Sequence, residues 1–267
     1  MDRQKLSQAY LYVLNNTTEV ISYIDAHKQN VTATHPKMNM MKVLQEHNRT
    51  FINWFRKTIF ADDNVSKILR LLVVGPNLNV PTWKRYDINN YSFYTKSQDD
   101  KSTVQTSEVS VDAHSDHFSS ASNNHPIWVF IPYFGVIQEI WELDYGDFRV
   151  RVFKCNWVNG NVGVRQDKMG FTLDDLQKVG YKDKPFIMTA QAKQVFYVKN
   201  LSDSRWSVIL QGKTGGITYD IDASTLDVNE MPIFSPQMPS INAENEEDDV
   251  HATRNDHHEG FWENTPM

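Results

Sequence analysis

Residues Tyr133–Trp157 read YFGVIQEIWELDYGDFRVRVFKCNW, and this stretch decides the fold class. Phe148, Val150 and Val152 alternate with two arginines, which is the pattern of a strand with one buried face. From Phe153 onward the apolar side chains occupy the other set of alternate positions. A β-bulge or burial on both faces would explain that change, so the stretch predicts β structure at the centre of a core.

Strand and turn signals continue on both sides of this stretch. Residues 144–147 read DYGD, a turn sequence, and the preceding Val136–Leu143 fits a strand, with a helical turn as the alternative. Asn159-Gly160 is a second turn signal. Further short strands are predicted at Pro185–Ala190, Gln194–Val198 and Trp206–Leu210. Residues 131–211 are therefore predicted to form a small β-rich, barrel-like module.

Three helices are predicted before this module. Apolar side chains recur at alternating steps of four and three over residues 6–27, the spacing of one helix face. A second helix fits Asn39–Ile59, and a third fits Val65–Val73 with residue 63 or 64 as its N-cap. We expect residues 1–75 to be a helical unit.

Two other segments lack the composition of a packed core. Residues 97–126 are rich in Ser, Asp, Asn and His, so they bury too little apolar surface to offset their chain entropy. We predict that residues 76–130 are a connector and a flexible polar linker. Residues 212–267 are predicted to be a disordered acidic tail, since residues 244–260 hold seven acidic residues and one arginine. The predicted fold class is α+β.

Composition limits the classes of function. The 267-residue chain has a net charge of −6, which disfavours a nucleic-acid binder acting through its whole surface. Its single cysteine, Cys155, cannot form an internal disulfide, and it falls in a predicted strand, which indicates a buried thiol. The sequence has neither a signal-peptide pattern nor an apolar run long enough to span a membrane. We expect an intracellular protein that does not enter membranes.

Potential catalytic and metal-binding groups fit structural roles better. Four close pairs of aspartates are candidates for metal binding or proton transfer: Asp62 and Asp63, Asp99 and Asp100, Asp144 and Asp147, and Asp174 and Asp175. These are interpreted as helix caps and turns, with Asp174 at a predicted helix start. The linker contains three histidines, His114, His117 and His125. A polar linker does not fix the geometry that zinc needs, and His47 is interpreted as a core histidine. We predict no catalytic residue, metal ion, cofactor or small-molecule substrate.

Basic side chains beside aromatic ones in the β module are the one candidate site. Such groups can bind nucleic acid through phosphate contacts and base stacking. The candidate residues are Arg149, Arg151, Lys154, Arg165 and Lys193. Core packing is the competing explanation for the aromatic residues.

Six blocks of the sequence resemble the C-terminal, transposase-associated regions of plant En/Spm (CACTA-type) transposon proteins. They are Ala9–Lys28, Glu46–Phe55, Val74–Thr95, Gly135–Trp157, Asp167–Thr172 and Pro185–Val198. The resemblance implies two adjacent domains of unknown function, the first ending near residue 75 and the second covering about 130–210. Relatives carry Gln-Asn-Ser-Gly-Val in the linker, where this chain has Gln105-Thr106-Ser107-Glu108-Val109.

The resemblance also implies a function. The transposase catalytic core of such proteins lies upstream of these regions, so we expect a non-catalytic accessory protein, a fragment of a larger transposase polyprotein. Other transposase subunits or nuclear proteins are its expected partners, and the nucleus its expected location. The alternative is a DNA- or chromatin-binding module, because the β-rich segment also resembles SH3-like and bromo-adjacent homology barrels.

Overall fold

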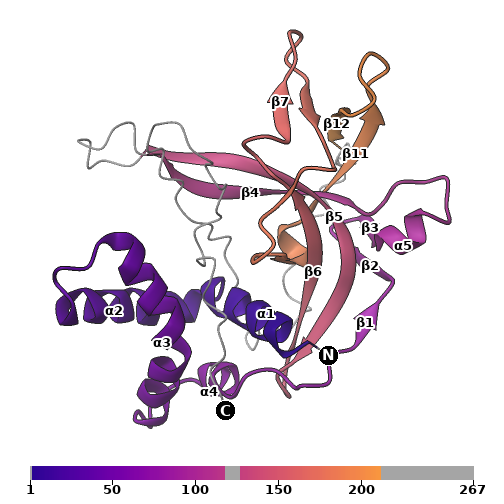
Figure 1. The fold of residues 1–267 in the computed structure, drawn as a ribbon. Coiled ribbons are helices and arrows are strands. Elements are labelled where there is room, and N and C mark those ends of the chain that lie inside the picture. Colours follow the sequence, from indigo (N-terminus) through magenta and orange to yellow (C-terminus); the bar gives the residue numbers. More distant parts are fainter. Residues whose placement is uncertain (1, 118–126, 212–267) are drawn as a thin grey trace, which may run out of the picture.

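The computed structural model describes residues 2–117 and 127–211. Helices lie at the N-terminal end, and a strongly curled antiparallel sheet follows them (Figure 1). The predicted acidic tail, residues 212–267, lies outside the described residues. No helix in the described part of the chain is long and apolar enough to cross a membrane.

The first predicted helix is interrupted after its third turn. Two helices, α1 (Arg3–Asn15) and α2 (Thr18–Thr34), replace the single helix expected over residues 6–27. Asn16 donates its side-chain amide to the Tyr12 carbonyl at 2.9 Å, and Thr17 donates its hydroxyl to the Val13 carbonyl at 2.7 Å. These side chains terminate α1 locally, and the extended backbone of Thr17 (φ −100°, ψ 121°) starts α2 in a new direction.

The other two helices confirm the sequence prediction. Helix α3 spans Met40–Phe60, and Asn39 caps it by accepting the Lys42 N–H at 2.9 Å. Helix α4 spans Lys67–Val74, and Gly75 ends it with a φ of 89°. Its N-cap is Ser66, not residue 63 or 64 as predicted, because the Ser66 hydroxyl is the group that reaches an N–H of the first turn.

The β region is a curled half-barrel. Within the described residues its main sheet follows the strand order β10-β6-β5-β4-β11-β12-β8-β7, with β1 paired to β5 and β9 paired to β6. Its strands are β1 (Thr82–Trp83), β4 (Glu108–His117), β5 (Ile127–Asp144), β6 (Arg149–Val158), β7 (Val164–Gln166), β8 (Thr172–Asp174), β9 (Val179–Gly180), β10 (Phe186–Met188), β11 (Lys193–Lys199) and β12 (Ser207–Gln211). The three late strands predicted from sequence are confirmed as β10, β11 and β12.

The flexible linker prediction is wrong for residues 108–117. These residues form β4, which pairs with β5 from Glu108 opposite Val136 to His117 opposite Ile127. A short helix, α5 (Lys96–Asp99), precedes it. The polar composition of the whole segment hid a local alternation in which Val109 and Val111 are buried. Pairing with the apolar strand β5 brings β4 into the sheet, where its valines are buried despite the polar composition of the segment.

The long strands β5 and β6 explain the register change seen in the sequence. The bulge lies in β5, where Gln138 is the extra residue between the Ile137–Cys155 and Glu139–Lys154 pairs. Val152 and Phe153 are both fully buried, so β6 is also covered on both faces at this point. The turn predicted at residues 144–147 is confirmed by the hydrogen bond from the Tyr145 N–H to the Phe148 carbonyl, 3.0 Å.

A small hairpin covers one face of β6. Strands β2 (Arg85–Ile88) and β3 (Tyr91–Tyr94) pair around Asn89 and Asn90, which have φ values of 53° and 63°. Phe93 from this hairpin packs on Phe153, with ring centroids 5.1 Å apart.

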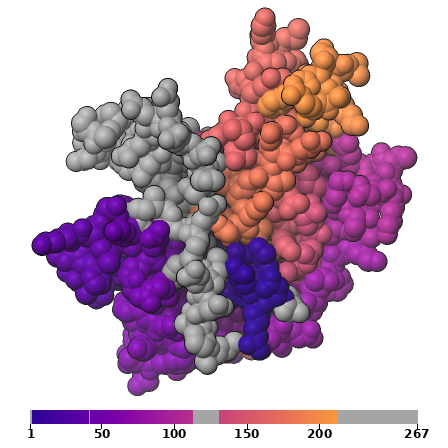
Figure 2. Space-filling view, viewed as in Figure 1, coloured from indigo at the N-terminus to yellow at the C-terminus, as the bar shows by residue number. Residues whose placement is uncertain are grey.

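Helices and sheet share one hydrophobic core. A single cluster of buried side chains includes residues of α1, α3 and α4 together with residues of β5, β6 and β10. Hydroxyl groups of α1 add polar links, since Tyr10 donates to the Leu72 carbonyl and Tyr12 to Gln191, both at 2.7 Å. In Figure 2 helices α2 and α3 lie at one end of the molecule and the hairpins of β7 and β12 at the other.

Candidate functional site

Two of the five predicted nucleic-acid-binding residues share one face of β6. Arg149 and Arg151 lie on alternate positions and both reach Glu142 on β5, with nitrogen–oxygen distances of 3.5 and 2.7 Å. The Glu142 side chain is 5% exposed. The guanidinium carbon of Arg151 also lies 5.0 Å from the centroid of the Tyr86 ring. A nearly buried carboxylate therefore offsets charge on both arginines.

Lys154 lies on the opposite face of β6, because successive side chains of a strand alternate between faces. Its amino group is 2.5 Å from a carboxylate oxygen of Glu139 and 5.7 Å from the centroid of the Trp141 ring. The second Glu139 oxygen accepts the Trp141 indole N–H at 2.8 Å. Lys154 is thus part of a local structural network and not of a surface shared with the two arginines.

The last two predicted residues lie on other strands. Arg165 of β7 stacks on Trp206, with its guanidinium carbon 3.8 Å from the ring centroid. Lys193 of β11 pairs with Asp112 of β4 at 2.5 Å. Each of the five basic side chains therefore has an acidic or aromatic partner, and the structure does not bring the five together on one face of the sheet.

The half-barrel buries two carboxyl groups that both act on Tyr197: Glu108, which the sequence did not single out as a candidate group, and Asp174, which the sequence placed at a helix start. Asp174 lies on β8 between Val164 of β7 and Ser207 of β12. Glu108 lies at the start of β4, and Tyr197 of β11 interacts electrostatically with both carboxyls. Tyr197 belongs to a small apolar cluster with Phe134, Val136, Val195 and Ile209.

Burial sets the protonation of these groups. It raises the pKa of Asp174 from 3.8 to about 7, and the Tyr197 hydroxyl offsets part of that shift. Burial, with the charge of Asp99 as a smaller contribution, raises the pKa of Glu108 from 4.5 to about 7. Burial also raises the pKa of Tyr197 well above 10.0. Burial is the largest of these effects on Asp174, so the neutral form of its carboxyl is favoured below about pH 7.

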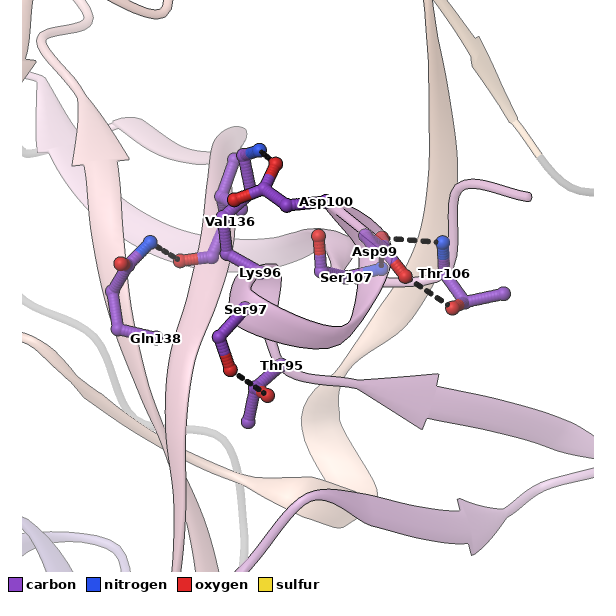
Figure 3. Close-up of polar contacts among 9 residues, drawn as sticks. All are labelled: Thr95, Lys96, Ser97, Asp99, Asp100, Thr106, Ser107, Val136 and Gln138. Carbon is purple, nitrogen blue, oxygen red and sulfur yellow. Dashed lines mark hydrogen bonds and ion pairs between the residues drawn. The ribbon is translucent and has the colours of Figure 1, made fainter. Parts of the chain in front are cut away.

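An ordered loop, held by Asp99, leads into the first residue of β4, Glu108, and Figure 3 shows the contacts of Asp99. The Asp99 carboxylate accepts the N–H groups of Thr106 and Ser107 at 2.8 and 2.6 Å and the Thr106 hydroxyl at 2.8 Å. The Ser107 carbonyl then accepts the Ile137 N–H at 2.8 Å, next to the bulge of β5. Asp99 therefore fixes the entry of β4 into the sheet, within a segment predicted to be a flexible linker.

This arrangement can exchange protons near neutral pH, because two carboxyls with a pKa of about 7 are each partly protonated there. Asp174 is fully buried, so a substrate cannot reach it in this conformation. Across residues 2–117 and 127–211 there is no group of three or more His, Cys, Asp or Glu side chains suited to a metal ion. The protonation of Glu108 and Asp174 therefore acts on the stability of the sheet.

The sequence contained little signal for this cluster. The prediction that Asp174 starts a helix is wrong, because Thr172–Asp174 is a strand paired on both sides. Strand β8 has three residues, which is too few to show a periodic pattern in the sequence. Its place between β7 and β12 is decided by pairing with those strands. For Glu108, the one signal in the sequence is that apolar and polar residues alternate directly after it, which is typical of a strand. His47 and Cys155 are buried as predicted.

The comparisons with known proteins place one domain in the chain. Residues 141–209 match the family model of a domain of unknown function, DUF4216. The match begins within β5 and ends within β12, so a DUF4216 domain covers much of the half-barrel. No curated protein matches the chain, and no solved structure matches it.

Proposed function

We propose that this chain is a non-catalytic accessory part of an En/Spm-type transposon protein, and that its β module binds other transposase subunits. The six sequence blocks shared with the transposase-associated regions of such proteins support the proposal. The DUF4216 match over residues 141–209 lies within the span that the resemblance assigns to the second of those regions. A nuclear location follows from the same proposal.

Exposed apolar side chains on ordered turns are the observation that most favours protein binding. Met169 is 84% exposed at the β7–β8 turn, and Leu201 is fully exposed at the β11–β12 turn. The Asp167 carboxylate accepts the Met169 N–H at 2.8 Å, and the Asn200 N–H donates to the Trp206 carbonyl at 2.9 Å. Because these turns are already ordered, a protein partner that covers them loses little conformational entropy.

The alternative is DNA or chromatin binding by the half-barrel, in the manner of SH3-like or bromo-adjacent homology modules. The pairing of Arg149, Arg151, Lys154 and Lys193 with carboxylates weighs against it, because each ion pair must be broken or shared before a phosphate is bound. The net charge of −6 acts in the same direction.

Co-expression with the catalytic transposase of an En/Spm element tests the proposal. We expect the two proteins to co-purify, and expect Met169→Asp with Leu201→Asp to reduce the yield of the complex at least tenfold. Met40→Asp is the matched control, because Met40 is an exposed apolar residue of the helical region. An equal loss with the control would contradict binding through the turns.

A fluorescence-anisotropy titration with duplex DNA at low and moderate salt separates the two candidate functions. Binding that weakens with salt and with Arg149→Ala would favour the DNA-binding alternative. A DNA-cleavage assay with Mg²⁺ or Mn²⁺ is expected to show no activity, and cleavage that depends on a carboxylate would refute the non-catalytic proposal.

A further inference from the structure

Two histidines meet between the second and third helices. His27 of α2 and His47 of α3 have their Nδ1 atoms 2.8 Å apart, and both side chains are buried. Two ring nitrogens at this distance share one proton, so one nitrogen donates and the other accepts. The contact therefore requires that at least one of the two Nδ1 atoms be unprotonated.

The surroundings define which nitrogen accepts. Thr50 donates its hydroxyl to the Glu46 carbonyl at 2.6 Å, so its oxygen is free to accept the His27 Nε2–H at 3.3 Å. His27 then carries its proton on Nε2, and its Nδ1 accepts the proton on His47 Nδ1. Full protonation of both rings would place an N–H group on each Nδ1, put the two groups head to head and break the contact.

Burial among aromatic rings removes both imidazoles from water and makes that second charge costly. The His27 ring lies 4.9 Å from the Trp54 ring, and the His47 ring stacks on Phe51 at 4.9 Å between centroids. The nearby Glu46 carboxylate favours a charged His27, but it is paired with Arg49 and only partly buried. Burial outweighs Glu46, and the pKa of His27 is lowered from 6.5.

We propose that the His27–His47 contact is a pH-sensitive latch that holds α2 against α3 at neutral pH and releases it in mildly acidic solution. The closed pair accepts at most one charge, whereas separated histidines each accept one. Well below about pH 6.5, where both separated histidines are charged, opening therefore takes up at least one proton, and acid drives it. Release exposes the aromatic face formed by Phe51 and Trp54. This inference is independent of the proposed function.

Amide hydrogen exchange of the whole chain tests the latch between about pH 5 and about pH 7.5. After correction for the intrinsic exchange rate, the opening constant of α2 and α3 amides should rise about tenfold per pH unit below about pH 6.5. Amides in the paired centre of β5 and β6 should not show that rise. A flat opening constant for α2 and α3 would overturn the proposal.

Variants identify the groups responsible. His27→Gln keeps an amide donor and acceptor but cannot titrate, so it should remove the pH dependence. His35→Gln, at the exposed C-terminal end of α2, is the matched control and should keep it. A slope that survives in His27→Gln would overturn the proposal.

If that variant does not fold, imidazole ¹⁵N spectra of the unchanged protein decide the question. They should show at least one neutral ring wherever the helices are closed. Two charged rings in closed helices would refute the latch.

Discussion

The helical region and the half-barrel both bury titratable groups, but of opposite kinds. Between α2 and α3 the buried groups are bases, His27 and His47, whereas the sheet buries the acids Glu108 and Asp174. Burial disfavours the charged form in both regions, so it lowers the pKa of His27 and raises the pKa of both carboxyls. The same physical effect therefore gives the two regions opposite responses to pH.

The direction of each response follows from proton linkage. A carboxyl whose pKa is raised to about 7 stabilises the fold at acidic pH, and this contribution is lost as the pH rises from about 4 through about 7. A histidine whose pKa is lowered binds its proton more readily in the unfolded chain, so stability is lost as the pH falls below about 6.5. Because both regions share one core, each response should influence the other.

The largest expected effect comes from breaking that shared core. Phe153→Ala removes a fully buried ring that packs on Phe93, and should lower the free energy of unfolding by about 3–5 kcal/mol. On unfolding of this variant, the far-ultraviolet circular dichroism signal and the tryptophan fluorescence should change in a single common transition, because helices and sheet unfold together. The control Phe60→Ala, at an exposed site, should change stability by less than about 1 kcal/mol. Separate transitions for helices and sheet would contradict a common core.

Removing the acid response should have the next largest effect. Asp174→Asn imitates the neutral carboxyl, and should raise the free energy of unfolding at about pH 8 by about 4 kcal/mol while leaving it nearly unchanged at about pH 4. Urea unfolding at the two pH values measures this. Asp147→Asn, at an exposed turn, serves as the control. A loss of stability at about pH 8 would mean that Asp174 is charged and compensated in the fold.

The response of the histidine pair can be measured once both opposing carboxyls have been neutralised. In a protein that carries Asp174→Asn and Glu108→Gln, stability should fall by about 1.4 kcal/mol per pH unit below about pH 6.5, because unfolding takes up one extra proton. Adding His47→Gln should flatten this profile. If the profile stays steep after that change, another group is responsible.

The smallest effect concerns the loop that leads into β4. Asp99→Ala removes the acceptor of the Thr106 and Ser107 N–H groups, and should cost about 1–2 kcal/mol. Asp100→Ala removes only an exposed ion pair with Lys96, and should cost less than about 0.5 kcal/mol. Thermal unfolding of the two variants measures the difference. Equal costs would show that Asp99 does not anchor the strand.

Sequence patterns predicted the elements that carry their own signal. Helix α3 was predicted because its apolar face is a local feature of the sequence. Strand β6 and the turn at residues 144–147 were also predicted, from alternating apolar residues and from a turn sequence. The break at Asn16 and Thr17 was missed because two side chains with no apolar pattern end the helix. The five candidate basic residues could be chosen from the sequence by their type, but their partners could not, because the partners lie on other strands or turns.

The amino-acid sequence alone determined the order of helices before strands, the central β hairpin and the burial of Cys155, since each depends on periodicity and turn residues close in the chain. Only the tertiary structure decided that β4 is a strand, that Asp174 is buried, and that His27 meets His47. Those outcomes depend on contacts between residues far apart in sequence. Strand pairing and burial are free-energy terms of the assembled core, and no single segment contains them.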